Sequence, residues 1–375
     1  KTDDRHKACV ARAAQRPGQN ELGGVKRLNH RYKAQHPRTA FHNVRFVVEQ
    51  AHERSAAEET KRRVKAAVKQ LDFKPRKKTK NYAKKEGSCI ALIIPNASNH
   101  YYMEMMRSVS HFSDNMGYRL ITINTNRTES NEEQYLQMLS GMQPKISGII
   151  YGFTPTQSSR RTLASLDIPT IVIGELLDEK DLECVSLDSY ISGMTIANHL
   201  IDLGHTRLAY ITSPPSLISL SRARRLAGIR EACRGKAVLE VFTKTEESEF
   251  DSENYEQQLG YELTLSCLAK PHQKVSAYIG ANDMISLGIL QALEEKGKHI
   301  PDDVSVCGFD NLLLSSYTHP PLTTMDHHSY GRCGLAVELL NNKILNKYPN
   351  PSSINYLPTL IVRESTGRVP PRSEQ

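Results

Sequence analysis

The chain has 375 residues, of which 39% are hydrophobic, so it is long enough to build two or three packed domains. It has no Trp and no apolar run near the ~20 residues that a membrane span needs, and its first residues lack the apolar stretch of a secretory signal. The seven Cys show no CxxC motif and no close Cys/His spacing, which argues against a structural metal and a disulfide framework. We expect no membrane partner, no metal, no cofactor, and reduced thiols in the cytoplasm.

Charge is distributed unevenly along the chain. Residues 1–86 hold 24 Lys and Arg against 9 Asp and Glu, a net charge of +15, whereas the remaining residues hold 25 against 32, a net charge of −7. A basic segment joined to a mildly acidic body is typical of proteins that bind polyanions. For residues 1–54 the composition leaves two interpretations open: a basic binding segment, or a solvated and disordered tail.

A helix is predicted at residues 56–72, where a capping box from Ser55 to Glu58 opens it and a narrow apolar stripe runs along one face. The helix is expected to end before Pro75, because the residue before a proline resists the α conformation. A basic linker follows. We expect phosphate contacts from the basic side chains of this helix and linker, which are Lys61, Arg62, Arg63, Arg76, Lys77, Lys78 and Lys80.

From Cys89 onward, short apolar runs alternate with longer amphipathic stretches. The runs predict strands at residues 89–95, 118–124, 146–152, 169–174, 207–212, 275–281 and 303–309. Helical patterns lie at residues 101–117, 131–142, 192–204 and 285–297, and several end in a Gly suited to a helix C-terminus. Apolar runs without alternation indicate strands buried on both faces, as in parallel sheets covered by helices. The number of alternations exceeds one doubly wound sheet, so we predict an α/β fold with two such lobes.

Six stretches of the sequence are informative when they are taken together. They are SAAEETKRRVKAAVKQLDFKP, IALIIPNASNHYYMEMM, HLIDLGHTRLAYIT, RRLAGIREA, ANDMISLGILQALEEKGKHIPDDVSVCGFDN and PPLTTM. In this order they resemble the lactose-repressor/galactose-repressor (LacI/GalR) family of transcription regulators, and the resemblance covers about residues 55–367. Each is weak alone, but the ordered set is specific.

The resemblance implies a periplasmic-binding-protein-like effector module at residues 87–370, with a tail at 371–375. We expect an N-lobe from residues 87–189 and 328–355, and a C-lobe from residues 190–327 and 356–370. Residues 55–86 would form the last helix of a DNA-binding head and a hinge.

The N-terminal part departs from the family pattern. The family places a helix-turn-helix directly before Ser55, and residues 1–54 show none that we recognise. A reading-frame error in the underlying gene is one interpretation, and genuine divergence is the other. The hinge differs too, because the position of the family's minor-groove Leu falls on Tyr82. An aromatic ring there either parts a base step or packs on the effector module.

The resemblance also implies a ligand site at the carboxyl ends of the strands, between the lobes. The side chains that align with effector-binding positions are Tyr101, Tyr102, Ser219, Ser221, Arg225, Tyr255, Asn282 and Asp310. Arg225 is expected to grip hydroxyl groups or a carboxylate, and an aromatic ring at Tyr101 or Tyr102 to stack on a sugar. Arg222 and Arg224 are expected to be solvated.

The expected function is a repressor of a carbohydrate-utilisation operon. It would bind operator DNA as a homodimer, under the control of a sugar, sugar phosphate or sugar acid. A member of the family that has lost specific DNA binding, and a solute-binding protein, are the alternatives. Catalysis is not expected, because GxSxG, P-loop, HExxH and dinucleotide motifs are missing and the pair His327-His328 lacks a carboxylate partner at fixed spacing.

Overall fold

In the computed structural model, the described part of the chain runs from residue 88 to residue 369. Residues 127, 143–144, 176–181, 214–219, 245–253, 271–273 and 347–352 within this range are not described. The chain divides into two units, residues 1–82 and 83–375, and everything below concerns the second. The predictions for residues 1–86, with the helix opened at Ser55 and the DNA contacts up to Tyr82, lie outside the described residues. No helix in the described part is long and apolar enough to cross a membrane.

The first sheet, which defines the N-lobe, is parallel throughout. Its strand order is β11-β5-β4-β3-β1-β2. The strands are β1 (Cys89–Ile94), β2 (Arg119–Asn124), β3 (Ile146–Tyr151), β4 (Thr170–Gly174), β5 (Glu183–Leu187) and β11 (Ile354–Tyr356). Its helices are α5 (His100–Asn115), α6 (Glu129–Gly141), α7 (Gln157–Ser165) and α12 (Ser329–Ile344).

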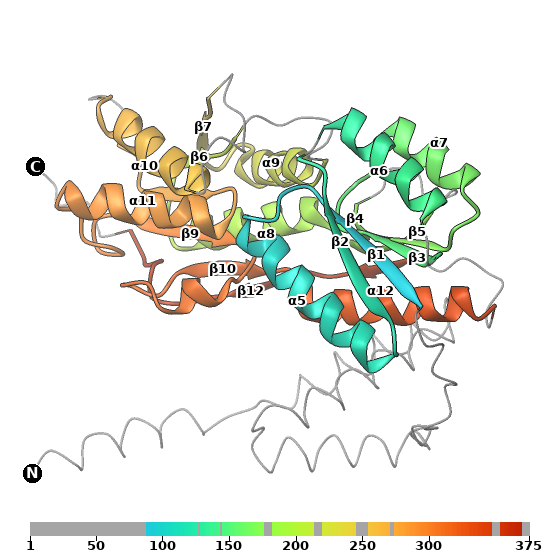
Figure 1. Ribbon diagram of the computed structural model, residues 1–375. Helices are drawn as coiled ribbons and strands as arrows, with labels where there is room; N and C mark the ends of the chain where they lie inside the picture. The colour runs from blue at the N-terminus through green and yellow to red at the C-terminus, as the bar shows by residue number, and fades with distance from the viewer. Residues whose placement is uncertain are drawn as a thin grey trace, which may run out of the picture. The chain divides into compact units, whose positions relative to one another are not determined.

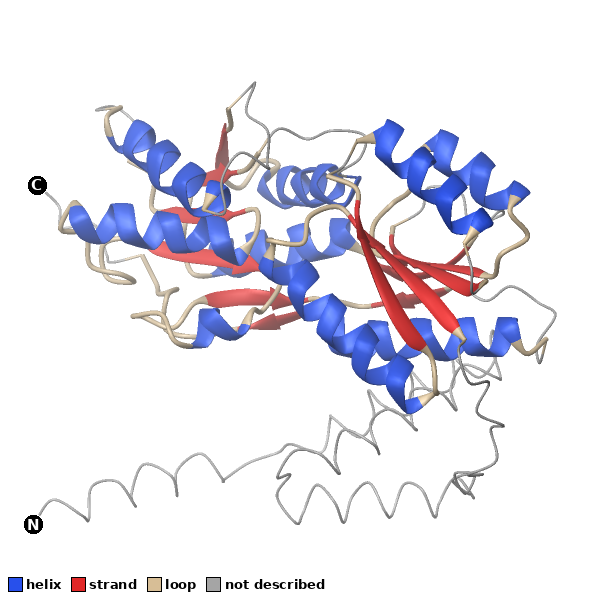
Figure 2. Ribbon diagram, in the orientation of Figure 1, coloured by secondary structure: helices blue, strands red, loops and turns tan. Residues whose placement is uncertain are grey.

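Helices cover both faces of the N-lobe sheet, as Figures 1 and 2 show. Alternate residues of β1 point to opposite faces, so Ile90 and Leu92 pack with α5 and α12, while Ala91 and Ile93 pack with α6 and α7. All six residues of β1 are buried, which explains why its sequence is apolar without alternation.

The second sheet defines the C-lobe and has the order β12-β10-β9-β8-β6-β7. The strands are β6 (Arg207–Ile211), β7 (Val238–Phe242), β8 (Ala277–Gly280), β9 (Ser305–Phe309), β10 (Thr323–Asp326) and β12 (Thr359–Ile361). All pairs are parallel except β10 with β12, which are antiparallel. The helices are α8 (Ser189–Asp202), α9 (Leu220–Cys233), α10 (Tyr255–Leu268) and α11 (Asp283–Glu295). A short 3₁₀ helix, η2 (Leu313–Ser316), follows β9.

This architecture confirms the predicted α/β fold with two doubly wound lobes. All seven predicted strands are present, and the glycines after three of the predicted helices, Gly117, Gly204 and Gly297, have the positive φ of a helix C-terminus. The sequence analysis missed β5, β7, β10, β11 and β12. These strands are three to five residues long, which makes their sequence signal short. In β10 the buried residues include Thr323 and Thr324, whereas the sequence analysis looked for apolar runs.

The chain passes between the two sheets three times. It leaves the first sheet after β5 for α8, returns from β10 to α12, and leaves again from β11 to β12. Each lobe is therefore assembled from segments that are far apart in the sequence, and the connections between the lobes are short.

Two pairs of helices in the C-lobe cross with almost no space between their backbones. At the crossing of α8 and α9, a Cβ atom on Gly193 would collide with the carbonyl oxygen of Arg225, and one on Gly228 with the carbonyl oxygen of Tyr190. Gly260 and Gly288 play the same part between α10 and α11. Only glycine allows backbones to approach this closely, so the crossing at Gly193 determines where the backbone of Arg225 lies.

We predict that Gly193→Ala destabilises the chain by about 1–3 kcal/mol, because the added methyl group overpacks a contact between two backbones. Urea unfolding measures the change. Gly141→Ala is the control, since a Cβ at Gly141 meets nothing within 4 Å, and it should change the free energy of unfolding little. Equal stability of the two variants would show that α8 and α9 do not cross this closely.

Candidate effector site

A cleft that is open to solvent lies where the carboxyl ends of the strands of both sheets meet. Residues that follow β1, β3, β4 and β5 line it from the N-lobe, and residues that follow β8, β9 and β10 line it from the C-lobe. The lining side chains used below are Asn99, Tyr101, Tyr102, Glu175, Ser221, Arg222, Arg225, Asn282, Asp310, His327 and Arg332. This is the position at which open parallel sheets bind ligands.

Arg225 on α9 is the central cation of the C-lobe wall. Its side chain is 9% exposed, and its Nη2 lies 3.7 Å from Oδ1 of Asp310. Its Nη1 donates a hydrogen bond to the carbonyl oxygen of Ala281, and its guanidinium carbon lies 4.5 Å from the centre of the Phe309 ring. The plane of the guanidinium is thus held by an aromatic face and an anion together.

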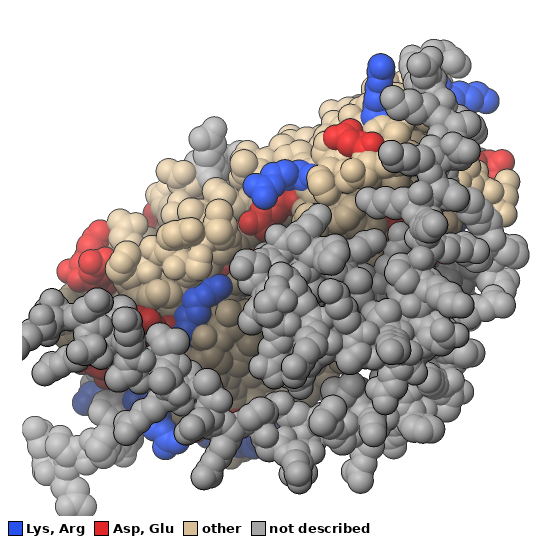
Figure 3. All heavy atoms as spheres, turned by 90° about the horizontal axis from the view of Figure 1, so that it is seen from below, with Lys and Arg blue, Asp and Glu red and all other residues tan. Residues whose placement is uncertain are grey.

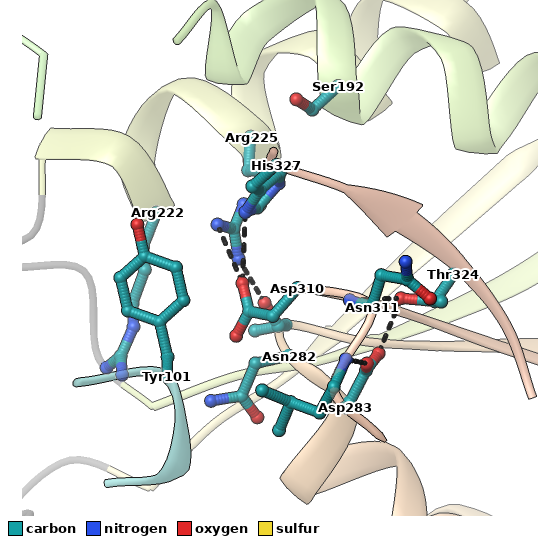
Figure 4. A network of polar contacts seen from close by, with 12 residues as sticks. Tyr101, Ser192, Arg222, Arg225, Asn282, Asp283, Asp310, Asn311, Thr324 and His327 are labelled. Carbon is teal, nitrogen blue, oxygen red and sulfur yellow. Dashed lines mark hydrogen bonds and ion pairs between the residues drawn. The ribbon is translucent and has the colours of Figure 1, made fainter. Parts of the chain in front are cut away.

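Asp310 directly follows β9 and has a φ of 104°, a conformation that a residue with a side chain rarely adopts. Its backbone N–H donates to the carbonyl oxygen of Met325, which ties the turn to β10. Strain of this kind persists only where surrounding contacts enforce it, and it concentrates at functional sites. Here it directs the carboxylate toward Arg225 and His327 (Figure 4).

His327 contradicts one expectation of the sequence analysis, because it does have a carboxylate partner. Its Nδ1 lies 3.0 Å from Oδ1 of Asp310. Burial, followed by the nearby positive charge of Arg225, lowers the pKa of His327 to about 4. The ring is therefore neutral at pH 7, with the proton on the nitrogen that faces the carboxylate. Its Nε2 has no hydrogen-bond partner in the described part of the chain.

Asn282 has a structural role as well as a place in the cavity wall. Its side-chain oxygen accepts a hydrogen bond of 2.9 Å from the backbone N–H of Ile285 and so caps α11. Because this oxygen is engaged by the helix, the amide NH₂ group is what Asn282 offers to a ligand as a donor.

Asp283 lies beside the site and was not anticipated from the sequence. It is buried and accepts hydrogen bonds from the backbone N–H of Leu312, the hydroxyl of Ser315 and the hydroxyl of Thr324. Burial, and then the negative charge of Asp310, raises the pKa of Asp283 to about 7. The carboxyl group holds the loop after β9 against β10 and α11.

The two tyrosines after β1 differ in their surroundings. Tyr101 is half-buried, and its hydroxyl accepts a hydrogen bond of 3.4 Å from Nη1 of Arg332. Tyr102 is 8% exposed and belongs to the N-lobe core, with its ring edge-to-face to Tyr101 at 5.2 Å. Both side chains border the cavity.

The three remaining predicted residues are placed differently from one another. Ser221 lines the cavity, and Ser219 lies outside the described residues. Tyr255 begins α10 and is 7% exposed in the C-lobe core, and it is not one of the described residues that line the cavity.

The sequence analysis expected Arg222 and Arg224 to be solvated. In the structure both side chains form ion pairs. The side chain of Arg222 is 12% exposed, donates to the hydroxyl of Ser213 and lies 3.1 Å from Oε1 of Glu256. The Nε of Arg224 lies 2.8 Å from Oε1 of Glu175. Nothing in the local sequence distinguishes these helix arginines from solvated ones, since their carboxylate partners are distant along the chain.

Two polar contacts connect the lobes at the edge of the cavity. Asn99, which caps α5 in the N-lobe, donates from Nδ2 to Oε2 of Glu256 on α10 at 2.9 Å. The pair of Arg224 and Glu175 joins α9 to the end of β4. Opening of the lobes would break both contacts.

The described side chains of the site do not form a metal centre. No group of three or more His, Cys, Asp or Glu in the described residues is arranged to hold a metal ion. The chemistry that this wall offers is hydrogen bonding and charge.

We predict that the stability contributed by Asp283 depends on pH. Between about pH 4 and pH 7 the folded chain keeps a proton that the unfolded chain releases, so the free energy of unfolding falls as the pH rises, by up to about 1.4 kcal/mol per pH unit. Asp283→Asn removes this titration. Urea unfolding at pH 5 and pH 7 should show wild type losing stability relative to Asp283→Asn.

The exposed Asp302 supplies the control, and Asp302→Asn should follow wild type at both pH values. A difference between wild type and Asp283→Asn that stays constant from pH 5 to pH 7 would contradict the raised pKa.

Comparison with known proteins agrees with this geometry. The sequence-family model for the periplasmic binding protein-like domain matches residues 197–366. The chain is 28% identical over 319 residues to the ribose operon repressor of Escherichia coli (strain K12), covering 84% of this chain and 92% of that repressor. It is 29% identical over 322 residues to the HTH-type transcriptional repressor PurR of Escherichia coli, covering 84% and 91%.

Among solved structures, a LacI family transcriptional regulator from Enterococcus faecium with bound ribose has the same fold. Its TM-score is 0.63 at 22% identity, and the match covers 76% of this chain and 100% of that chain. The fold, the cavity between the lobes and the sequence relatives are in agreement. Over most of its length the chain is similar to repressors of the LacI/GalR family.

Proposed function

We propose that the chain is a DNA-binding transcriptional repressor controlled by a small sugar-like effector that binds between the two lobes. The observation that carries the proposal is the set of buried polar atoms at the cavity. Oε2 of Glu175, Nε of Arg225, Nε2 of His327 and Nε of Arg332 have no hydrogen-bond partner among the described residues. Buried polar groups in folded proteins are nearly always satisfied, so these atoms favour a polar ligand.

A sugar fits the mixture of donors and acceptors in this wall. Asp310 and Glu175 accept from hydroxyl groups, the NH₂ group of Asn282 donates, and the ring of Tyr101 offers an apolar face. The name of the ribose operon repressor, and the ribose in the Enterococcus faecium structure, support a ligand of this class.

The charge distribution supports DNA contact by residues 1–86. Their net charge of +15 contrasts with −7 in the remainder. On the described surface visible in Figure 3, Lys and Arg lie interspersed with Asp and Glu rather than in a field of one sign. We therefore assign the contacts with DNA phosphates to the predicted helix and linker, which contain Lys61 and Arg76. A repressor of this kind would act in the cytoplasm, where bacterial DNA lies.

An effector held by both lobes supplies the control. The ligand bridges the same walls that the contacts of Asn99 with Glu256 and of Arg224 with Glu175 already join. It therefore favours one relative orientation of the lobes, and it shifts the population toward that orientation by its differential affinity. The relatives named above are repressors rather than enzymes, and we propose a binding role without catalysis.

A second candidate is a sensor that has lost specific DNA reading, which the missing helix-turn-helix pattern in residues 1–54 favours. Binding of the full chain to a palindromic duplex selected from a random library, and to a scrambled duplex, separates the two. We expect affinity for both duplexes to fall about 10³-fold or more between 50 and 200 mM salt, because phosphate contacts release counterions. Discrimination above about a thousandfold identifies a specific repressor, and lower discrimination identifies the sensor.

The response to effector depends on Arg225. We predict that Arg225→Ala lowers effector affinity at least about tenfold, because it removes charge-assisted hydrogen bonds. Calorimetry with the effector measures this loss, and anisotropy of labelled duplex shows that DNA binding is retained.

Arg207→Ala is the matched control. Arg207 lies on the C-lobe surface, 44% exposed and 3.9 Å from Glu240, and its loss should leave effector affinity unchanged. Equal effector affinity of wild type and Arg225→Ala would remove Arg225 from the site.

A homodimer is also proposed, and one apolar surface supports it. Met103 at the start of α5 and Leu313 and Tyr317 around η2 are 47%, 66% and 71% exposed. The two segments are adjacent, because the backbone of Leu313 lies close enough to the carboxyl group of Glu104 to affect its pKa. Exposed apolar patches of this kind mark protein interfaces.

We predict that Tyr317→Glu shifts the full chain from dimer to monomer, because it places a charge in this apolar surface. Sedimentation at micromolar concentration distinguishes the two states. Val238→Glu, at an exposed apolar position on the edge strand β7, should remain dimeric. A wild-type monomer, or a dimeric Tyr317→Glu, would rule out this interface.

A further inference from the structure

The cavity contains three arginines, and two of them are matched by carboxylates. Arg225 lies 3.7 Å from Asp310, and Arg222 lies 3.1 Å from Glu256. Arg224, outside the lining, pairs with Glu175 and with Asp188. Arg332 on α12 lines the cavity and makes no ion pair with any described residue.

Arg332 is also the most deeply buried of these arginines, with 3% of its surface exposed. Its Nη2 donates to the carbonyl oxygen of Val185 at 3.1 Å, and its Nη1 donates to the hydroxyl of Tyr101 at 3.4 Å. Its Nε has no partner within the described residues. Within the described part of the chain, its hydrogen bonds go to neutral groups and no carboxylate balances its buried charge, which is costly for any protein.

The position of Arg332 in its helix adds to this imbalance. It lies in the first turn of α12, which contains no acidic residue, and His328 at the N-cap makes no side-chain cap hydrogen bond. The N-terminus of a helix carries a partial positive charge and favours anions over cations. A second positive charge there raises the local potential further.

The groups around Arg332 are suited to an anionic oxygen. Burial raises the pKa of Tyr101, so its hydroxyl keeps its proton and can donate it while it accepts from Arg332. Burial likewise lowers the pKa of His327 to about 4, so that ring adds no positive charge that Asp310 would have to balance. The excess positive charge in the cavity is therefore that of Arg332.

We infer that the effector is an acidic sugar, and that Arg332 with Tyr101 binds its carboxylate or phosphate while the other walls bind its hydroxyl groups. This inference rests on the proposed function and narrows its ligand class. A neutral sugar would leave the charge of Arg332 uncompensated, whereas a carboxylate or a phosphate would neutralise it through charge-assisted hydrogen bonds. Arg332 is the specificity-determining residue in this arrangement.

Calorimetry of the full chain with matched sugars tests the inference. D-glucose is compared with D-glucuronate and D-glucose 6-phosphate, and D-ribose with D-ribose 5-phosphate. At least one acid should bind about tenfold or more tightly than its neutral counterpart, as expected for a charge-assisted contact. The acid that binds best identifies the anionic group as a carboxylate or a phosphate.

Variants separate recognition of charge from a structural role. Arg332→Gln should lower the affinity for the acid to about that of the neutral sugar, and Arg332→Lys should keep a preference for the acid. Arg160→Gln is the control, since Arg160 on α7 is a partly buried arginine of the same lobe that does not line the cavity. It should leave the ratio of acid to neutral affinity unchanged.

Neutral sugars that bind as tightly as the acids would overturn the inference and leave the proposed function intact. The same holds if Arg332→Gln lowers the affinities for acid and neutral sugars equally, which would indicate a structural role. If none of the five sugars binds, the proposed sugar control fails, and the inference fails with it.

Discussion

The buried guanidinium of Arg225 is the group on which the C-lobe side of the cavity depends. Its backbone is positioned by the contact with Gly193, and its plane by the ring of Phe309. A charge in this position requires a nearby anion, and Asp310 supplies it at the cost of a backbone conformation with a φ of 104°. The carboxylate then sets the tautomer of His327. The close crossing of α8 and α9 thus positions Arg225, and Arg225 in turn determines where the carboxylate of Asp310 is needed after β9.

Much of the fold could be predicted because its signals are local. Strands buried on both faces, such as β1 and β9, need uninterrupted apolar residues, and glycines such as Gly117 end helices in a conformation that other residues resist. The strands that were missed lack such signals. β7 is an edge strand with one buried residue, and β11 has three residues that form a strand only because β5 offers a partner.

The site was predictable to the extent that its residues follow strands or match a family motif. Tyr101, Arg225, Asn282 and Asp310 were expected there and do line the cavity. Arg332 could not be found in this way, because it lies on a helix more than 200 residues from Tyr101, and only the assembled sheet brings them together. The same is true of Asn99 and Glu256, which meet across the lobes.

The threefold passage of the chain between the sheets has a consequence for its synthesis on the ribosome. The first strands to emerge belong to the N-lobe, yet α12, which covers one face of their sheet through Val337 and Leu340, is translated after β10 of the C-lobe. Until then the side chains of Ile90 and Leu92 lack part of their cover. The lobe that starts first is therefore completed only after all strands of the other lobe except β12 have been translated, and until then the nascent chain presents an apolar sheet face to chaperones.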